Sequence, residues 1–576
     1  MVKKNISESN NLNDLKKYNW GLGIEHEMHL FHAPKLNNKK NITDFTLFDS
    51  DIVVKKLIEE KDNSKIMLNY DEYNFLKSIP FETSGRRCND KWVIETVPIK
   101  MPEFITNQPF CSISKNRDIK AMTREIITDK QKYYDLLMLD KNTKKLVKKY
   151  GTLAEYPFGM TRYLKYSLNN SNGTYKFKKD FLVPEYNGSY HITMTLPHKE
   201  NISDKKFIKM HQNFCNQLQW LEPLLLTTYF TGDEYAPGTL NKRVRGSFRV
   251  MIIGWGNFAG SDVRLFNKGI GRYAKTPTYW RKGLKFIDSD KLKPCFKPSP
   301  MAKKEKAITS LSSDFRTFGS TDPTRPMHRE SGVGMTKPNG IEFRIFDHFS
   351  DKYIEHLLNL IGLVAENSRV KETKDYVYKN KTWIKEMHNI MKNGYKAKLS
   401  QDYIKLLRNK LGLKIKTKSI IAFDVFKNIY EELWKKNMNG KWSKIFHCMI
   451  RPKMDNYVFP QINKKGWQFA FMVKLNREKT LLKKFNNLSK ILTKLKKINY
   501  KDFTSIILKT FGKNWKDDIE DIAYFYESLK YATLKKNIDG TLNEIIINRK
   551  IDIFKNFNNE IISYFGNSII QNIIST

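Results

Sequence analysis

Cysteine and acidic residues are scarce in this sequence, and long apolar runs are missing. Its five cysteines are scattered over 576 residues, and no two have the spacing of a zinc-binding pair. Such a dispersed, odd-numbered set argues against a disulfide framework, so we expect a reducing, cytoplasmic location. No run of about eighteen apolar residues is present, which argues against a transmembrane helix and a membrane partner. The polar beginning of the chain lacks the apolar segment of a signal peptide.

Basic residues outnumber acidic ones, with 102 Lys and Arg against 60 Asp and Glu and a formal net charge of +42. This surplus would attract nucleic acid or an anionic substrate, but Lys, Asn and Ile are also what AT-rich codons encode. Residues 371–576 hold 42 Lys and Arg against 19 Asp and Glu, which leaves +23 there and +19 in residues 1–370. Nucleic-acid or other polyanion binding by the C-terminal region therefore remains open beside codon bias.

The length of the chain predicts roughly two to four domains. Residues 1–18 have the composition of a polar tail, and residues 19–370 alternate strand-like and helical patterns. Beyond residue 370 the pattern becomes Lys-rich and mainly helical. Within that region, apolar residues from Leu481 to Leu495 follow alternating four- and three-residue steps, which predicts a helix with one apolar stripe. We expect the stripe to be core, with a partner-binding helix as the alternative.

Residues 20–32 read WGLGIEHEMHLFH and combine two carboxylates with three imidazoles. A zinc-protease helix needs two histidines four residues apart, and the spacing of three in HEMH excludes that site. In a strand, alternation would place Glu25, Glu27 and His29 on one face and His26 on the other. That first face would carry two hard oxygen ligands, as a divalent-cation site requires. His29 is then either a ligand, a base for the amine or a packed residue.

Three further strand-like segments carry polar residues in an apolar pattern. Glu95 lies in WVIETVP, His191 in GSYHITM, and Glu342 and Arg344 in GIEFR. Charged groups at inward positions of strands are costly unless they are paired or bind a metal. Carboxylates with one imidazole suit Mg²⁺ or Mn²⁺ better than an ion that prefers thiolates.

These four segments, in this order, resemble the carboxylate–amine ligases, which are the amidoligase and glutamate–cysteine ligase relatives of glutamine synthetase. The segments NQLQWLEPLLLTTYFTG and GSFRVMIIGWGNFAG also resemble that family, so the resemblance covers about residues 19–370. It implies an α+β fold in which a cupped antiparallel sheet with flanking helices holds metal and nucleotide on one face. It also implies ATP-dependent formation of an amide or isopeptide bond through an acyl phosphate.

The resemblance assigns roles position by position. The ligands that it implies for two Mg²⁺ or Mn²⁺ ions are Glu25, Glu27, Glu95, His191 and Glu342. Arg344 would stabilise the transferring phosphoryl group, and Arg249 and Arg245 would contact nucleotide phosphate or the substrate carboxylate. These roles agree with the physics of phosphoryl transfer, which is catalysed mainly by positioning and by cations near the developing charge.

Two other hypotheses remain open. The chain could be a nucleic-acid-binding or virion-associated structural protein on a relic ligase fold, although decay would be expected to remove the carboxylates first. It could also be a phosphotransferase like the guanidino kinases, whose catalytic domain resembles that of glutamine synthetase. The sequence does not identify the small-molecule or peptide carboxylate or the amine, because specificity in this fold lies on loops.

Overall fold

The structure is a computed structural model. It describes residues 19–28, 30–32, 46–83, 100–105, 110–111, 119–150, 153–155, 165–169, 174–178, 189–198, 204–229, 315–317, 341–343, 346, 349–373, 380–438 and 459–549. These ranges contain helices and antiparallel sheets, which confirms the predicted α+β class in its general form. None of the helices in them has the length and apolar content needed to cross a bilayer.

A central antiparallel sheet carries two of the four predicted motifs on long strands. Its strands follow the order β11-β12-β10-β1-β5-β4, and β6 also pairs with β1. Their bounds are β1 Asn19–Glu27, β4 Phe81–Thr83, β5 Lys100–Ile105, β6 Phe110–Cys111, β10 Ser189–His198, β11 Phe315–Thr317 and β12 Ile341–Phe343. The sequence predicted β1 and β10 at these places, and β12 covers the middle of the predicted strand 339–349.

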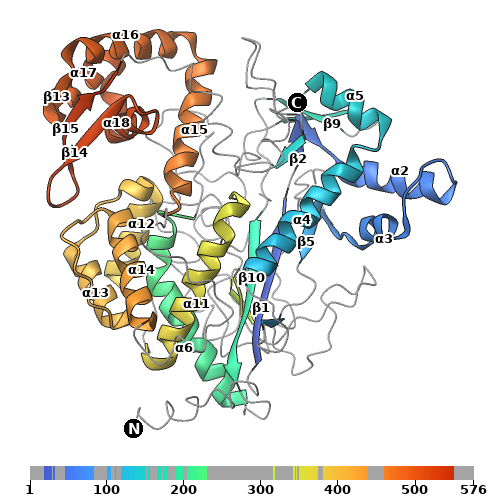
Figure 1. Ribbon diagram of the computed structural model, residues 1–576. Coiled ribbons are helices and arrows are strands. Elements are labelled where there is room, and N and C mark those ends of the chain that lie inside the picture. The colour runs from blue at the N-terminus through green and yellow to red at the C-terminus, as the bar shows by residue number, and fades with distance from the viewer. Residues whose placement is uncertain are drawn as a thin grey trace, which may run out of the picture.

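Helices cover one face of this sheet (Figure 1). They are α4 Ile119–Leu137, α6 Asp204–Leu225 and α11 Ile354–Val370, which follows the short helix η7 Asp351–Tyr353. Helix α4 contacts β5, α6 contacts β10, and α11 packs against both helices. The apolar sheet residues Ile24, Phe104 and Ile192 are buried beneath them. The hydrophobic core of the sheet therefore lies on this helical side.

A second antiparallel sheet has the order β7-β2-β3-β9-β8. Its strands are β2 Leu30–His32, β3 Thr46–Phe48, β7 Leu153–Glu155, β8 Lys165–Asn169 and β9 Thr174–Lys178. The helices of this part of the chain are α2 Ser50–Asp62, α3 Tyr70–Ser78 and α5 Lys141–Tyr150. Helix α3 begins with a capping box between Asn69 and Glu72, which satisfies backbone donors at its first turn.

Helices beyond residue 370 continue the same hydrophobic core. They are α12 Lys381–Asn393, η9 Gly394–Lys396, α13 Gln401–Leu411 and α14 Ala422–Met438. Two buried aromatic residues join them to α6: Trp383 Nε1 donates to the carbonyl of Gln219 at 2.8 Å, and the Tyr403 hydroxyl donates to the carbonyl of Trp220 at 2.8 Å. The division near residue 370 stays a prediction.

The last described elements, residues 462–549, form what we call the C-terminal unit, which has its own hydrophobic core. They are α15 Ile462–Arg477, α16 Lys479–Leu495, β13 Lys497–Asn499, α17 Tyr500–Phe511, η12 Lys513–Asp518, α18 Ile519–Ser528, β14 Ala532–Lys536 and β15 Leu542–Ile547. The predicted stripe lies on α16: Leu481, Phe485, Leu488 and Leu492 are buried, and Leu495 at its end is 47% exposed. The core interpretation of the stripe is confirmed.

Candidate metal and catalytic site

Two carboxylates and one imidazole meet on the centre of the sheet. The register pairs Glu25 of β1 with His191 of β10, so both residues share one face. His191 Nδ1 lies 3.1 Å from Glu25 Oε2 and 3.6 Å from Glu27 Oε1. All three residues are buried, with at most 4% of their surface exposed. Carboxylates and an imidazole are donor types that hard divalent cations use. Among the described residues, however, the three donor atoms that lie within 4.8 Å of one another belong to a different cluster, His26, Glu155 and Asp351.

The opposite face of the same strands confirms the predicted alternation. His26 lies between the two glutamates in sequence but stacks on Tyr190, with ring centroids 3.9 Å apart. Ile24 and Ile192 are also buried on the helical side. The segment is therefore a strand with a polar and a helix-covered face, and His26 is a packed residue.

Glu342 is placed on the acidic face by the strand register. It pairs with Thr193 of β10, which lies two residues beyond His191 and therefore on the same face. On its other side, Glu342 pairs with Arg316 of β11. The register thus brings one more of the predicted ligands to the side of the sheet that carries the glutamates, and it adds an arginine that the sequence analysis did not single out.

Glu103 is a further acidic residue next to β1 that the sequence motifs did not single out. It pairs with Glu27 across β5 and β1. One strand further, Glu82 pairs with Met101, which is two residues from Glu103. The alternation in KMPEFI could have indicated a strand with Glu103 on one face. The family motif instead drew attention to Glu95, a few residues upstream.

Several predicted site residues lie outside the residues that the structure describes. They are His29, Glu95, Arg245, Arg249 and Arg344. The glycine-rich loop at 254–272 and the polar tail at 1–18 also lie outside them. Their assignments stay predictions, which rest on the motifs alone.

A second cluster of metal-ligand type lies behind the acidic face. Ligand atoms of His26, Glu155 and Asp351 lie within 4.8 Å of one another. Lys130 Nζ contacts all three: Glu155 Oε1 at 2.5 Å, the Asp351 oxygens at 2.7 and 2.8 Å, and His26 Nδ1 at 3.0 Å. The ammonium group has three N–H donors and meets three acceptor groups. Lys130 therefore already supplies the cation that this cluster needs, and we assign no metal to it.

The position of Lys130 in α4 was a signal in the sequence. Met122, Ile126, Tyr133 and Leu137 form the buried stripe of α4, and Lys130 lies four residues after Ile126 within it. Its side chain is 1% exposed. A lysine at a core position of an amphipathic helix must be neutralised by acids, because a buried charge is otherwise very costly. The spacing alone did not say which acids these would be.

Tyr190 completes this internal charge cluster. Its hydroxyl donates a hydrogen bond to Asp351. Burial raises the pKa of Tyr190 well above its usual value, and the negative charges of Asp351 and Glu155 raise it further. The phenol therefore stays protonated and keeps its role as a donor.

No protein-family model matches the chain. Among curated proteins, the chain is similar to the uncharacterized protein R704 of Acanthamoeba polyphaga mimivirus, with 23% identity over 293 residues. That alignment covers 50% of this chain and 47% of R704, so it spans about half the length of the relative. Among solved structures, the chain is similar to the crystal structure of the complex between the prokaryotic ubiquitin-like protein Pup and its ligase PafA. That match covers 98% of this chain and 95% of the other at 10% identity, with a TM-score of 0.33. A likeness this distant assigns neither activity nor substrate.

Proposed function

We propose that the chain is an ATP- and Mg²⁺-dependent ligase that joins a carboxylate to an amine. The observation that supports this most directly is the buried group of Glu25, Glu27 and His191, which lies on the antiparallel strands β1 and β10. Those residues occupy the GIEHE and GSYHITM motifs through which the sequence resembles carboxylate–amine ligases. The register position of Glu342 extends the same acidic face.

The donor set is of the kind that divalent cations use. Two carboxylates and one imidazole lie together in a water-poor position, where charged side chains are costly unless they are paired or bind a metal. Oxygen ligands with one imidazole match Mg²⁺ or Mn²⁺. When bound, such ions would draw charge from the phosphates of ATP. Glu25, Glu27, His191 and Glu342 would hold them, with Glu95 as a further predicted ligand.

The proposed reaction has two balanced steps. A carboxylate oxygen of the substrate attacks the γ-phosphorus of ATP, and the bond to the β,γ-bridging oxygen breaks to release ADP. The amine then attacks the carbonyl carbon of the acyl phosphate, inorganic phosphate leaves, and the amine gives up a proton. Arg344 would stabilise the transferring phosphoryl group, and Arg249 and Arg245 would anchor anionic groups.

Trapping the intermediate tests this proposal. Full-length protein is incubated with ATP, Mg²⁺, hydroxylamine and a panel of amino-acid and peptide carboxylates, and both ADP and hydroxamate are measured. We expect hydroxamate with the correct acid, because an acyl phosphate reacts with small amines. ADP release without hydroxamate across the panel would contradict the ligase and favour the guanidino-kinase-like phosphotransferase. No nucleotide turnover would favour the relic fold.

A further inference from the structure

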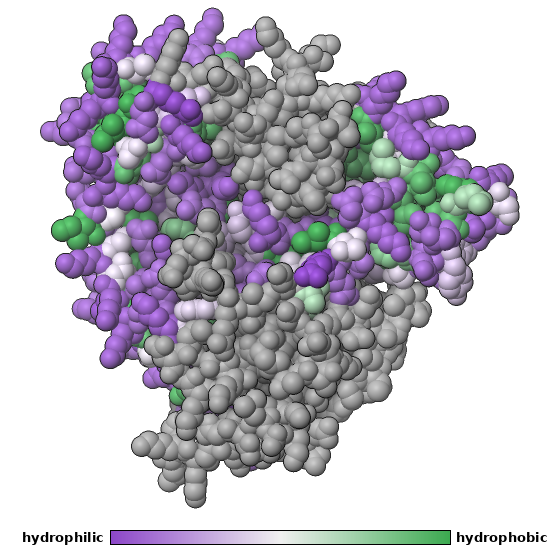
Figure 2. Space-filling view, in the orientation of Figure 1, coloured by the Kyte–Doolittle hydropathy of each residue, from purple (hydrophilic) through white to green (hydrophobic). Residues whose placement is uncertain are grey.

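Helix α16 has an apolar side inside the C-terminal unit and a basic side outside it. Its 17 residues, KTLLKKFNNLSKILTKL, include five lysines and no acidic residue. Figure 1 shows α16 at the outer edge of the unit, far from β1 and β10. The surface over this part of the molecule is mainly hydrophilic in Figure 2. The basic outer side of α16 is therefore separate from the proposed ligase site.

Four of the lysines form a straight row. At about 100° per residue, Lys479, Lys483, Lys490 and Lys494 fall within roughly 60° of the helix circumference. All four are exposed. The row spans 15 residue steps, which is about 22 Å at a rise of about 1.5 Å per residue. The sequence thus builds a line of positive charge along one side of the helix.

Among the residues that the structure describes, acids pair with other lysines and not with this row. Within the described part of the chain, no carboxylate forms an ion pair with any of its four lysines. Other lysines of the C-terminal unit do have an acidic partner: Lys497 and Lys535 pair with Glu544 at 2.9 and 3.4 Å. The unit therefore compensates lysines elsewhere but leaves the α16 row available to an anionic partner.

We propose that this α16 lysine row (Lys479, Lys483, Lys490 and Lys494) binds the phosphate backbone of a nucleic acid without reading its sequence. A row of flexible ammonium groups is complementary to a linear array of phosphates, each lysine acting as a point charge. A basic stripe along a helix is also the footprint expected of nucleic-acid binding. The row carries no feature that would distinguish one base from another.

The packing of α16 argues against a lipid surface as the partner. An interfacial helix inserts its apolar side among the lipids. The apolar side of α16 is buried in the core of the unit, through Leu481, Phe485 and Leu488. Beside the row, only Ile491 and Leu495 are exposed large apolar residues of this helix, at 42% and 47%. The helix therefore offers charge but no insertable face.

Fluorescence anisotropy with the full-length chain tests the proposal. The probes are a duplex DNA and a single-stranded RNA of arbitrary sequence, titrated across a series of salt concentrations. One variant replaces all four lysines of the row by Gln. A matched control replaces four other exposed lysines, Lys405, Lys414, Lys416 and Lys418, and so removes the same charge.

We expect the row variant to lose affinity and to flatten the salt dependence on duplex DNA. Four phosphate contacts correspond to a slope of about −3.6 in log K against log salt. When the salt concentration rises fourfold, the affinity of the wild type for duplex DNA should therefore fall by roughly 100-fold more than the affinity of the row variant. The control should keep the wild-type slope. Because all substituted lysines are exposed, the unfolding midpoints of both variants should match the wild type.

Three outcomes would overturn the proposal. The first is no measurable nucleic-acid binding at low salt. The second is an equal loss of affinity in the row variant and its control, which would mean that net charge alone attracts the polyanion. The third is row-dependent binding to vesicles of anionic phospholipid that is stronger than binding to nucleic acid. The hydroxamate assay reports on the ligase site separately, so its result leaves this test unaffected.

Discussion

At the scale of single residues, both sides of β1 carry buried carboxylates beside a nitrogen-bearing side chain. On the helical side, the carboxylates of Glu155 and Asp351 surround the ammonium group of Lys130. On the other side, Glu25 and Glu27 face a histidine in an equally buried position. Lys130 supplies a cation of the chain itself on the helical side, and the bound metal ion that we propose belongs to the side with the glutamates.

Replacing Glu27 tests the proposed metal site. Glu27→Gln removes a charge at nearly constant volume, so we expect Mg²⁺-dependent ATP turnover to be abolished while the protein remains folded. Turnover and the thermal unfolding midpoint should be measured together. Glu59→Gln is the matched control, because Glu59 is an exposed carboxylate on α2. Turnover of Glu27→Gln within about twofold of wild type, which is under about 0.5 kcal/mol, would exclude the metal-ligand role.

Replacing Lys130 tests the opposite side. Lys130→Met would leave Glu155 and Asp351 buried without their cation, so we expect the free energy of unfolding to fall by about 3–5 kcal/mol. Lys209→Met is the control: Lys209 Nζ lies 3.6 Å from Glu372 Oε1, and the two side chains are 78% and 38% exposed. An exposed pair of this kind contributes at most about 1 kcal/mol. Denaturant titration of both variants measures the difference, and equal losses would show that the Lys130 cluster is not stabilising.

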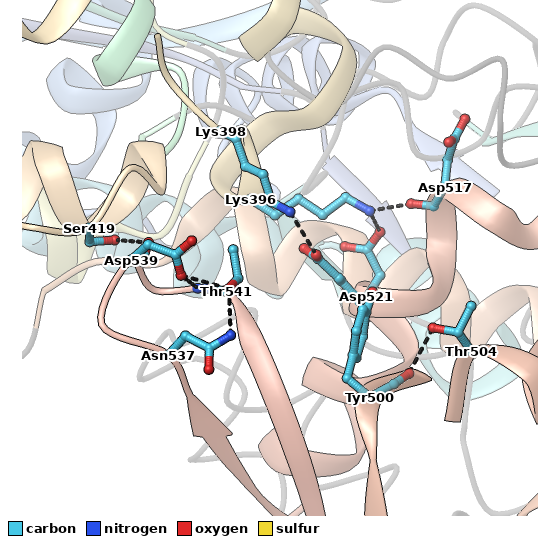
Figure 3. Close-up of polar contacts among 11 residues, drawn as sticks. Lys396, Lys398, Ser419, Tyr500, Thr504, Asp517, Asp521, Asn537, Asp539 and Thr541 are labelled. Atoms are coloured by element: carbon cyan, nitrogen blue, oxygen red, sulfur yellow. Dashed lines mark hydrogen bonds and ion pairs between the residues drawn. The ribbon is translucent and has the colours of Figure 1, made fainter. Parts of the chain in front are cut away.

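At the scale of elements, the C-terminal unit docks on the preceding helices through polar groups (Figure 3). Lys396 of η9 pairs with the buried Asp521 at 2.6 Å and also donates to the carbonyl of Asp517. At the tip of the β14–β15 hairpin, Ser419 Oγ donates to the carbonyl of Asp539 at 3.2 Å. The amide of Ile420 donates to the same carbonyl at 3.1 Å. The contacts of Ser419 and Ile420 require the tip of the β14–β15 hairpin to lie close to the segment that contains these two residues.

Gly540 permits that approach. Its φ is +83°, and a Cβ at this position would lie 2.3 Å from Ser419 Oγ and 3.0 Å from Asp424 Oδ2. We expect Gly540→Ala to destabilise the protein by more than the cost of backbone strain, which is about 1–3 kcal/mol. It should also speed hydrogen exchange at the Ile420 amide, since the hairpin tip must move away.

Gly512→Ala separates these two effects. Gly512 has a φ of +101°, and no described atom lies within 4 Å of a Cβ built there. This control should lose stability through backbone strain alone and leave exchange at Ile420 unchanged. If both variants gave the same loss of stability and the same exchange at Ile420, the proposed close contact at the hairpin tip would be wrong.

At the scale of the whole molecule, the hydrophobic cores do not divide where the composition changes. One core runs from the sheet through α14 to Ile462, and the second is formed by α15 and the elements after it together with Tyr395 of η9. A chain ending at residue 370 would expose the face of α6 on which Trp383 and Tyr403 pack. Experiments on nucleic-acid binding therefore need the full chain with surface substitutions. The change of charge density near residue 371 is a property of the surface. The boundary between the two cores is set by how the helices pack.

The sequence by itself determined the local elements and their faces. The alternation around Glu25 and Glu27 implied a strand with one polar side, because successive side chains of a strand point to opposite faces. The stripe on α16 likewise implied a buried face, because residues three and four apart line one side of a helix. Both signals lie within a few residues of sequence, which is why pattern reasoning reached them.

Only the tertiary structure decided which distant residues meet. Glu103 pairs with Glu27 in the register between β5 and β1, and a shift of one residue would have paired Glu27 with a different residue. Lys130 and Asp351 are 221 residues apart in the chain yet lie 2.7 Å apart. No local period encodes such a pair, since it depends on how helices and strands pack around a common core. The sequence therefore specified the chemistry of each strand face, and the packing specified which cation and which acids share it.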